Sequence, residues 1–417
     1  EWEALLQPEH ALVSASADRS PLVCSLVAHA ADRFVLSVST LALCADAATL
    51  KNLVYEIGQS YEACLQGRSI QDEPLQYADL AQWQHQLLEE AEPDQKNWDL
   101  KTLSELARSL KLPGEQPSTD AAAFDPQTYA ISLKPELAAQ IAAFAQQREI
   151  SMETVFLAVW QTAIWRLTEQ SEIVVNTACD GRKYEELASA LGLLTKYIPI
   201  RSHVDAELSF DRLVEQVETS VREACDRQEF WSRNASRDGD SNAEPLFLFP
   251  FGFKFEDWSA EYAAGGVRFS IEQMFTYIDR FKVRLSCVRR QDEWMVVFHY
   301  DSNAFLAADI QRLAEQFQTL TTHAIAQPQT PLDRLELLSE RERQRLLFDF
   351  NNTQTDLPSA LGIHHLFEAQ AEQTPDRVAL LFAGEPLTYA QLNTRANQLA
   401  HSLQRLRVGP EVLVGIC

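Results

Sequence analysis

The most obvious candidates for acid–base or metal chemistry are the adjacent histidines His364 and His365, because the remaining histidines of the chain are scattered. Imidazole titrates near neutral pH and is the commonest nitrogen ligand of metals. Adjacent residues on a helix, however, point about 100° apart, so the two rings cannot easily share one ligand. The pair also precedes an amphipathic run, which favours a surface or helix-capping role over a catalytic one.

A second candidate combines a carboxylate and a guanidinium that each follow a strand-like segment. Asp46 comes soon after the apolar segment 33–38 (RFVLSV), and Arg182 comes directly after IVVNTACDG (173–181). A lone buried carboxylate is costly unless it is paired, and a buried Asp46–Arg182 pair would satisfy both groups. Two independent, solvent-exposed loop residues are an equally good interpretation by these rules alone.

Composition and motif searches exclude several classes of protein without indicating a reaction. The 36 basic and 60 acidic residues give a net charge of −24. A surface this acidic repels nucleic-acid phosphates and anionic lipids, and no apolar run approaches the roughly 20 residues of a membrane span, so we expect no nucleic acid and no membrane as partner. The seven cysteines lie far apart without a CxxC pair, and no glycine-rich phosphate loop, HExxH or GxSxG motif occurs. We therefore expect a cytoplasmic protein with reduced thiols, no metal site and no directly bound cofactor.

Hydrophobic periodicity predicts the elements that would position these residues. A strand at 33–38 leads to a helix with an apolar face at residues 50, 53, 54 and 57, and a second helix is expected over 76–90. Residues 91–124, which contain three prolines, are expected to be a connector. Beyond it the pattern predicts, in order, a strand at 124–133, a largely buried helix capped by Ser151, a strand at 173–177, a helix capped by Ser209, a hairpin of 283–288 and 294–300, and a helix over 310–320. Strands alternate with helices, so the expected fold class is α/β.

Several stretches, in consistent order, resemble the condensation domain of nonribosomal peptide synthetases followed by the beginning of an adenylation domain. They are YADLAQW (77–83), RLTEQSEIVVNTACDGR (166–182), GLLTKYIPIR (192–201), FHYDSNAFLAADIQRLAEQF (298–317), the linker-like LELLSERERQRLLFDFNNTQTDLP (335–358) and an adenylation-like segment at 364–404 that contains LTYAQL. The resemblance covers nearly the whole chain, and it places the two adjacent histidines in the entry helix of the adenylation domain.

The resemblance implies two chloramphenicol-acetyltransferase-like lobes in a V arrangement, followed by a piece of an adenylation domain. The expected domains are a partial N-terminal lobe at 1–112, a C-terminal lobe at 113–334, a linker at 335–358 and an incomplete adenylation start at 359–417. In this family, upstream and downstream peptidyl carrier domains present thioesters on 4′-phosphopantetheine, and these meet at an HHxxxDG motif between the lobes. The second His helps an amine to attack the thioester, while the Asp pairs with an Arg of the other lobe.

This motif is degenerate in the present sequence. Aligned on the flanking strand and helix, HHxxxDG falls on residues 41–47, where the relevant positions are Leu41 and Ala42 for the two histidines, Asp46 for the aspartate and Ala47 for the glycine. The resemblance therefore implies that the structural salt bridge of Asp46 and Arg182 remains while no catalytic residue is intact. A later segment, RDGDSNAEPL (237–246), also departs from the family's pattern.

Three functions are compatible with this combination. We expect a condensation-like domain that receives carrier-bound thioesters as a scaffold, a gate or a platform that recruits a trans-acting enzyme, next to an adjoining adenylation domain. The alternatives are an unconventional catalyst that joins the thioesters by positioning alone, and a spacer that keeps the adenylation domain folded. Cys44 and Thr40 are nucleophiles by residue type, but no histidine is near them in the sequence to activate them.

Overall fold

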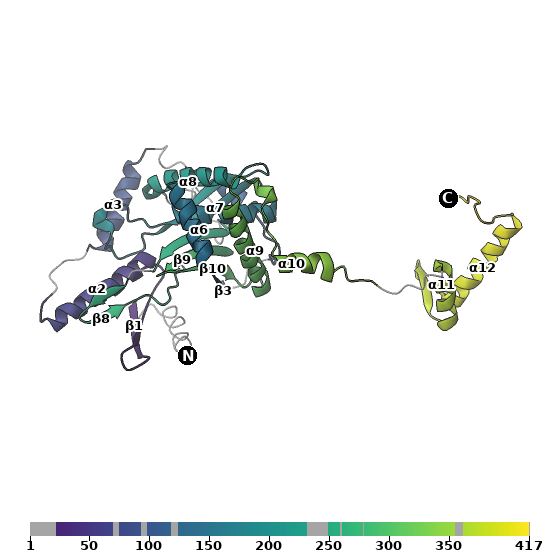
Figure 1. Cartoon of the computed structure of the whole chain (residues 1–417), viewed down its shortest axis with the longest axis horizontal. Coiled ribbons are helices and arrows are strands. Elements are labelled where there is room, and N and C mark those ends of the chain that lie inside the picture. Colours follow the sequence, from purple (N-terminus) through teal and green to yellow (C-terminus); the bar gives the residue numbers. More distant parts are fainter. Residues whose placement is uncertain are drawn as a thin grey trace. The chain divides into compact units, whose positions relative to one another are not determined.

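The computed structural model describes residues 22–69, 75–92, 98–117, 124–231, 249–258, 261–277, 279–354 and 362–416. The chain divides into two compact units, Glu1–Arg343 and Gln344–Cys417. The first unit holds a large mixed sheet with its helices, and the second holds a small hairpin with two helices (Figure 1).

The first unit is built on a six-stranded sheet with the strand order β3-β10-β9-β6-β4-β5. Its strands are β3 (Pro126–Ser132), β4 (Glu172–Cys179), β5 (Lys196–His203), β6 (Phe251–Asp257), β9 (Val283–Arg290) and β10 (Glu293–Asp301). Strand β6 runs parallel to both of its neighbours, and all other pairs in this sheet are antiparallel. A parallel neighbour requires a long crossover, which explains why the connections into and out of β6 are longer than a hairpin turn.

Four helices cover one face of this sheet: α6 (Pro135–Gln147), α7 (Met152–Thr168), α8 (Phe210–Asp226) and α9 (Ala307–Ala326) (Figure 1). Helix α7 is buried at every residue from 154 to 164, as its nearly all-round apolar sequence predicts. Ser151 caps it by accepting a hydrogen bond from the Thr154 N–H. At its centre, the Trp160 ring makes edge-on contacts with Phe251, Phe298 and Phe317.

The described residues of the first unit before β3 form a hairpin and three helices. These are β1 (Leu22–Ala28), β2 (Phe34–Thr40), α2 (Ala47–Leu65), α3 (Tyr77–Glu90) and α5 (Leu100–Ser109). Helix α2 packs on a second small hairpin, β7 (Tyr262–Ala264) with β8 (Val267–Phe269). Gly58 permits this contact, because a Cβ at its position would lie 2.4 Å from Cε1 of Tyr262. Segments that lie about 200 residues apart in the sequence thus pack together here.

The second unit contains α11 (Ile363–Gln373), the hairpin β11 (Val378–Phe382) with β12 (Glu385–Thr388), and α12 (Tyr389–Arg405). Thr388 begins α12 with a capping box: its hydroxyl accepts from the Gln391 N–H, and the Gln391 side chain accepts from the Thr388 N–H. The helix α10 (Glu340–Gln344) and a π-helical turn at Arg345–Asp349 span the boundary between the units.

The structure confirms most of the predicted elements and corrects one region. The expected connector at 91–124 contains the helix α5, which Asp99 caps by accepting from the Thr102 N–H. The prolines on either side of α5 favoured a connector in the sequence analysis. The apolar residues of the helix, among them Leu103 and Leu106, pack against the main core. Strands β1, β5, β6, β7, β8, β11 and β12 and helices α6, α10 and α12 were also not predicted. None of the helices in the described residues is long and apolar enough to cross a membrane.

Candidate functional site

The candidate site lies where α2 begins and where the loop after β4 turns towards β5. Asp46 is the N-cap of α2, and its Oδ1 accepts from the Thr49 N–H at 2.8 Å. In the loop after β4, Gly181 adopts a φ of +77°, and a Cβ there would lie 2.1 Å from the Leu194 carbonyl oxygen. Only glycine fits this turn, which brings Arg182 to the start of α2.

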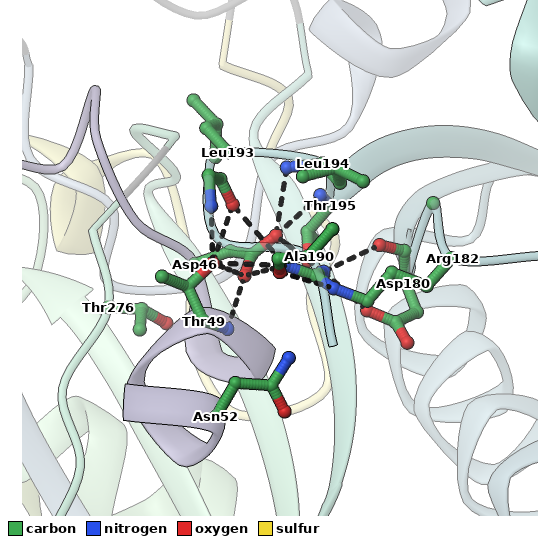
Figure 2. Close-up of polar contacts among 12 residues, drawn as sticks. Asp46, Thr49, Asn52, Asp180, Arg182, Ala190, Leu193, Leu194, Thr195 and Thr276 are labelled. Carbon is green, nitrogen blue, oxygen red and sulfur yellow. Dashed lines mark hydrogen bonds and ion pairs between the residues drawn. The ribbon is translucent and has the colours of Figure 1, made fainter. Parts of the chain in front are cut away.

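Asp46 and Arg182 form a bidentate ion pair between these two segments (Figure 2). Nη1 of Arg182 lies 2.9 Å from Oδ2 of Asp46, and Nη2 lies 3.0 Å from Oδ1. The side chains are only 2% and 1% exposed. Two parallel, charge-assisted hydrogen bonds of this kind are the strongest geometry available to such a pair. The interpretation of Asp46 and Arg182 as independent, exposed loop residues is therefore wrong.

The remaining hydrogen-bonding capacity of both groups is used by the segment that precedes β5 (Figure 2). Oδ2 of Asp46 also accepts from the N–H groups of Leu194 at 2.9 Å and Thr195 at 2.8 Å, and from the Thr195 hydroxyl at 3.0 Å. Nη2 of Arg182 donates to the carbonyl oxygens of Ala190 at 3.1 Å and Gly192 at 3.3 Å. The carboxylate and the guanidinium thus fix one loop in place, and neither has capacity left for a ligand.

These contacts control the charge state of Asp46. Burial by itself raises the pKa of this carboxyl, but the hydrogen bonds and charge of Arg182, together with the N–H groups of Thr49 and Thr195, outweigh burial and lower the pKa to about 2. Asp180 also lies 2.9 Å from Nη1 of Arg182, but its side chain is 61% exposed. Asp46 is therefore the buried counter-ion, and it is ionised throughout the physiological pH range.

Helix α3 supports the same loop from another side. Gly192 has a φ of +144°, and a Cβ at its position would lie 2.1 Å from Cδ2 of Tyr77. The Tyr77 hydroxyl donates to the Leu193 carbonyl oxygen at 3.3 Å. A small apolar cluster continues this contact and consists of Leu80, Trp83, Leu187, Ala190 and Leu194. The segment YADLAQW (77–83) therefore has a local structural role, which is to support the loop that binds Asp46.

The two positions that the resemblance assigns to histidines lie in an exposed turn. Leu41 is 37% exposed, Ala42 is also exposed, and the Cys44 N–H closes the turn on the Leu41 carbonyl at 2.8 Å. Cys44 is exposed, and Thr40 ends β2. In the described part of the chain, no hydrogen bond joins a histidine to either of these potential nucleophiles.

The adjacent histidines lie at the surface, and His365 caps a helix, as the sequence favours. Nδ1 of His365 accepts from the Gly362 N–H at 3.0 Å at the start of α11, and both histidines are exposed. Within the described ranges, no group of three or more His, Cys, Asp and Glu side chains is placed to hold a metal ion.

The family resemblance implied the ion pair, but sequence reasoning missed the groups that complete it. Thr49 and Thr195 were not singled out, although the Asp-x-x-Thr spacing at a helix start is a recognisable capping signal. The contact from Leu194 uses its backbone N–H, which every residue except proline has, so the residue type does not indicate it. The divergent segment 237–246 lies outside the described residues.

Comparisons with known proteins follow this division of the chain. The family model described as "Condensation domain" matches residues 15–347, and the model described as "AMP-binding enzyme" matches residues 367–417. Among curated proteins, gramicidin S synthase 2 of Aneurinibacillus migulanus is 28% identical over 396 residues, which are 94% of this chain and 9% of that protein. Tyrocidine synthase 3 of Brevibacillus parabrevis is 29% identical over 398 residues, 94% of this chain and 6% of that protein. The chain thus spans less than a tenth of each of these relatives.

Solved structures share the fold at low sequence identity. The four-domain nonribosomal peptide synthetase holo-AB3403, bound to AMP and glycine, has a TM-score of 0.72 at 15% identity, over 97% of this chain and 32% of that one. The condensation domain of the monacolin K polyketide synthase MokA has a TM-score of 0.66 at 18% identity, over 80% and 79%. The X-domain in complex with OxyB from teicoplanin biosynthesis has a TM-score of 0.64 at 19% identity, over 81% of this chain and 78% of that one. The predicted α/β fold of chloramphenicol-acetyltransferase type is confirmed.

Proposed function

The chain belongs to the condensation-domain family, and from this premise we propose that it serves a nonribosomal peptide synthetase as a condensation-like domain without His-assisted peptide-bond formation. Upstream and downstream carrier domains present thioesters to it on 4′-phosphopantetheine, and the domain acts as a scaffold, a gate or a recruitment platform. The adenylation domain that begins after residue 358 is its neighbour in the chain.

The observation that carries this proposal is the contrast between the two halves of the motif. Asp46 forms an ion pair with Arg182 and accepts hydrogen bonds from the N–H groups of Leu194 and Thr195. Leu41 and Ala42, by contrast, have no acidic, basic or hydrogen-bonding side chain in their exposed turn. Asp46 cannot replace the missing base, because its oxygens are fully hydrogen-bonded and its pKa is about 2. A general base works best when its pKa lies near the operating pH.

The known relatives support both parts of the proposal. Those compared above include named peptide synthases, which favours a place in such a synthetase. One structural neighbour is an X-domain in complex with OxyB, so a domain of this fold occurs as the docking partner of a second protein. We infer that recruitment of a trans-acting enzyme is the form of platform that best fits a preserved scaffold without a base.

The test uses the full-length protein that contains this chain, with its donor and acceptor carrier domains loaded. Condensation is followed by intact mass in the wild type, in Leu41→His/Ala42→His and in the matched control Leu41→Gln/Ala42→Gln, which adds polar groups without a base. We expect no dipeptide from the wild type or the glutamine control while both carriers remain bound.

The other outcomes contradict the proposal in different ways. Dipeptide formed by the wild type, and formed faster by the histidine variant, would identify a weak catalyst that works by positioning alone. Product formation that survives deletion of the whole domain from the full-length protein would identify a spacer. Each result replaces the platform with one of the two alternatives.

A further inference from the structure

The face of the six-stranded sheet opposite to helices α6–α9 carries buried polar side chains in place of an apolar core. The strand pairing aligns Asn176 with Gly252, Gly252 with Arg284, and Arg284 with His299, so these residues lie on one face of four adjacent strands. All four are buried. Their sequence neighbours point to the helix-covered face and belong to the hydrophobic core, for example Phe253, Leu285 and Phe298.

Arg284 is the unusual member of this polar face. It is 3% exposed, and its Nη1 donates to the Thr276 carbonyl oxygen at 2.8 Å and to the Tyr197 hydroxyl at 3.3 Å. Its Nε is buried and has no hydrogen-bond partner. No carboxylate forms an ion pair with it among the described residues, in contrast to Arg182. A buried guanidinium without a counter-charge is strongly destabilising, so this arrangement requires an explanation.

The neighbours of Arg284 do not supply the missing charge. Lys254 is neutralised by Glu256 at 2.6 Å and also donates to the Thr276 hydroxyl at 3.1 Å. Burial, together with the positive charges of Arg284 and Lys254, lowers the pKa of His299 well below its ordinary value, so the ring is neutral near pH 7. Nδ1 of His299 is likewise buried without a hydrogen-bond partner.

A small cavity lies against this pair. Arg284 and His299 line it together with Tyr277, Phe281 and Asp279. Its volume of about 10 Å³ admits roughly one water-sized group, so it fits the end of a ligand and not a whole small molecule. Asp279 also lines the cavity, and it has an interaction of its own.

We propose that Arg284 and His299 form a subsite for the carboxylate of a ligand, with one carboxylate oxygen in the cavity. The guanidinium supplies the positive charge, and its Nε–H, which has no other partner, can donate to that oxygen. The neutral imidazole can donate one further hydrogen bond through the nitrogen that carries its proton. Tyr277 and Phe281 flank the cavity with flat rings, which suits a planar carboxylate better than a tetrahedral phosphate. The inference stands on these contacts and does not require the proposed function.

The test measures binding of ¹³C-labelled acetate to the full chain by line broadening of the acetate signal, with inorganic phosphate as a second probe. We expect saturable acetate binding that weakens at least tenfold in Arg284→Met and several-fold in His299→Phe. Asp279→Asn is expected to tighten binding, because it removes the one carboxylate of the named lining residues. Arg289→Met, at the exposed end of the same strand, is the matched control and leaves binding unchanged.

Three results would overturn the inference. The first is non-saturable acetate binding in the wild type. The second is an equal effect of Arg284→Met and Arg289→Met. The third is phosphate binding at this site that is tighter than acetate binding, which would assign the subsite to a phosphate. Because Arg284→Met could unfold the chain, circular dichroism is recorded for each variant, and Asp279→Asn tests the site in the opposite direction. A failed carrier-loading experiment has no bearing on any of these outcomes.

Discussion

Nη1 of Arg182 lies 2.9 Å from Oδ2 of Asp46, although 136 residues separate the two in the sequence. The pair joins the start of α2 to the loop between β4 and β5, and the same carboxylate binds the N–H groups of Leu194 and Thr195. The interaction therefore holds together two segments that are far apart in the sequence. Its contribution to the free energy of unfolding can be measured directly.

Asp46→Ala is expected to lower the free energy of unfolding of the first unit by about 3–5 kcal/mol, because it strands a buried guanidinium. Urea unfolding followed by tryptophan fluorescence measures this, since all eight tryptophans precede residue 295 and none lies in the second unit. The matched control is Asp180→Ala, which removes a carboxylate at the same 2.9 Å distance from Arg182 but 61% exposed. It should cost less than about 1 kcal/mol. Equal losses in the two variants would contradict the burial argument.

The low pKa of Asp46 predicts a specific acid sensitivity. A carboxyl whose pKa falls from 3.8 when unfolded to about 2 when folded binds fewer protons in the folded state, so its stabilising effect is complete above about pH 4. This contribution is lost as the pH falls towards 2. The stability advantage of the wild type over Asp46→Asn should therefore shrink between pH 4 and pH 2, as measured by urea unfolding at each pH. An advantage that is constant over this range would show that the charge of Asp46 contributes nothing.

Gly181→Ala is expected to destabilise the first unit for two separable reasons. The φ of +77° is unfavourable for alanine, and the new Cβ would lie 2.1 Å from the Leu194 carbonyl oxygen. Gly67→Ala is the control, because Gly67 has a φ of +64° but no atom within 4 Å of the added Cβ. We expect a cost of about 1–2 kcal/mol for Gly67→Ala from the backbone alone, and a further 1–3 kcal/mol, roughly, for Gly181→Ala. Thermal or urea unfolding that ranks the two variants equally would rule out the steric contribution.

Glu153, in the first turn of α7, predicts the opposite dependence on pH. Burial and the negative charge of Glu218 raise the pKa of Glu153 to about 7. The folded state therefore binds more protons than the unfolded state between about pH 4.5 and 7, and this group destabilises the fold as the pH rises through that window. Glu153→Gln should thus gain stability relative to the wild type from pH 5 to pH 8. Urea midpoints measured across this range check the gain, and Glu136→Gln, in the exposed first turn of α6, is the control. A gain that does not grow with pH would mean that Glu153 is ionised in the folded state.

Local patterns in the sequence were enough for most of the secondary structure. The apolar periodicity and the caps Ser151 and Ser209 lead to α7 and α8, and the alternation at 283–300 leads to the hairpin of β9 and β10. Such signals are local, because a helix or a hairpin depends on residues a few positions apart. Helix α5 was missed for the same reason. The prolines on either side of it are close in the sequence and indicate a loop, whereas the core residues that stabilise it are far away in the sequence.

The sequence by itself determined the α/β class and the family resemblance, since these depend only on which residues stand in which order. The residue pattern alone left open whether Asp46 and Arg182 meet, because a loop residue after a strand can equally face solvent, and only the family resemblance implied the pair. Only the tertiary structure decided that question. It also decided that Arg284 and His299 lie side by side on the buried polar face, because the register of β9 against β10 fixes that relation and no local pattern encodes it.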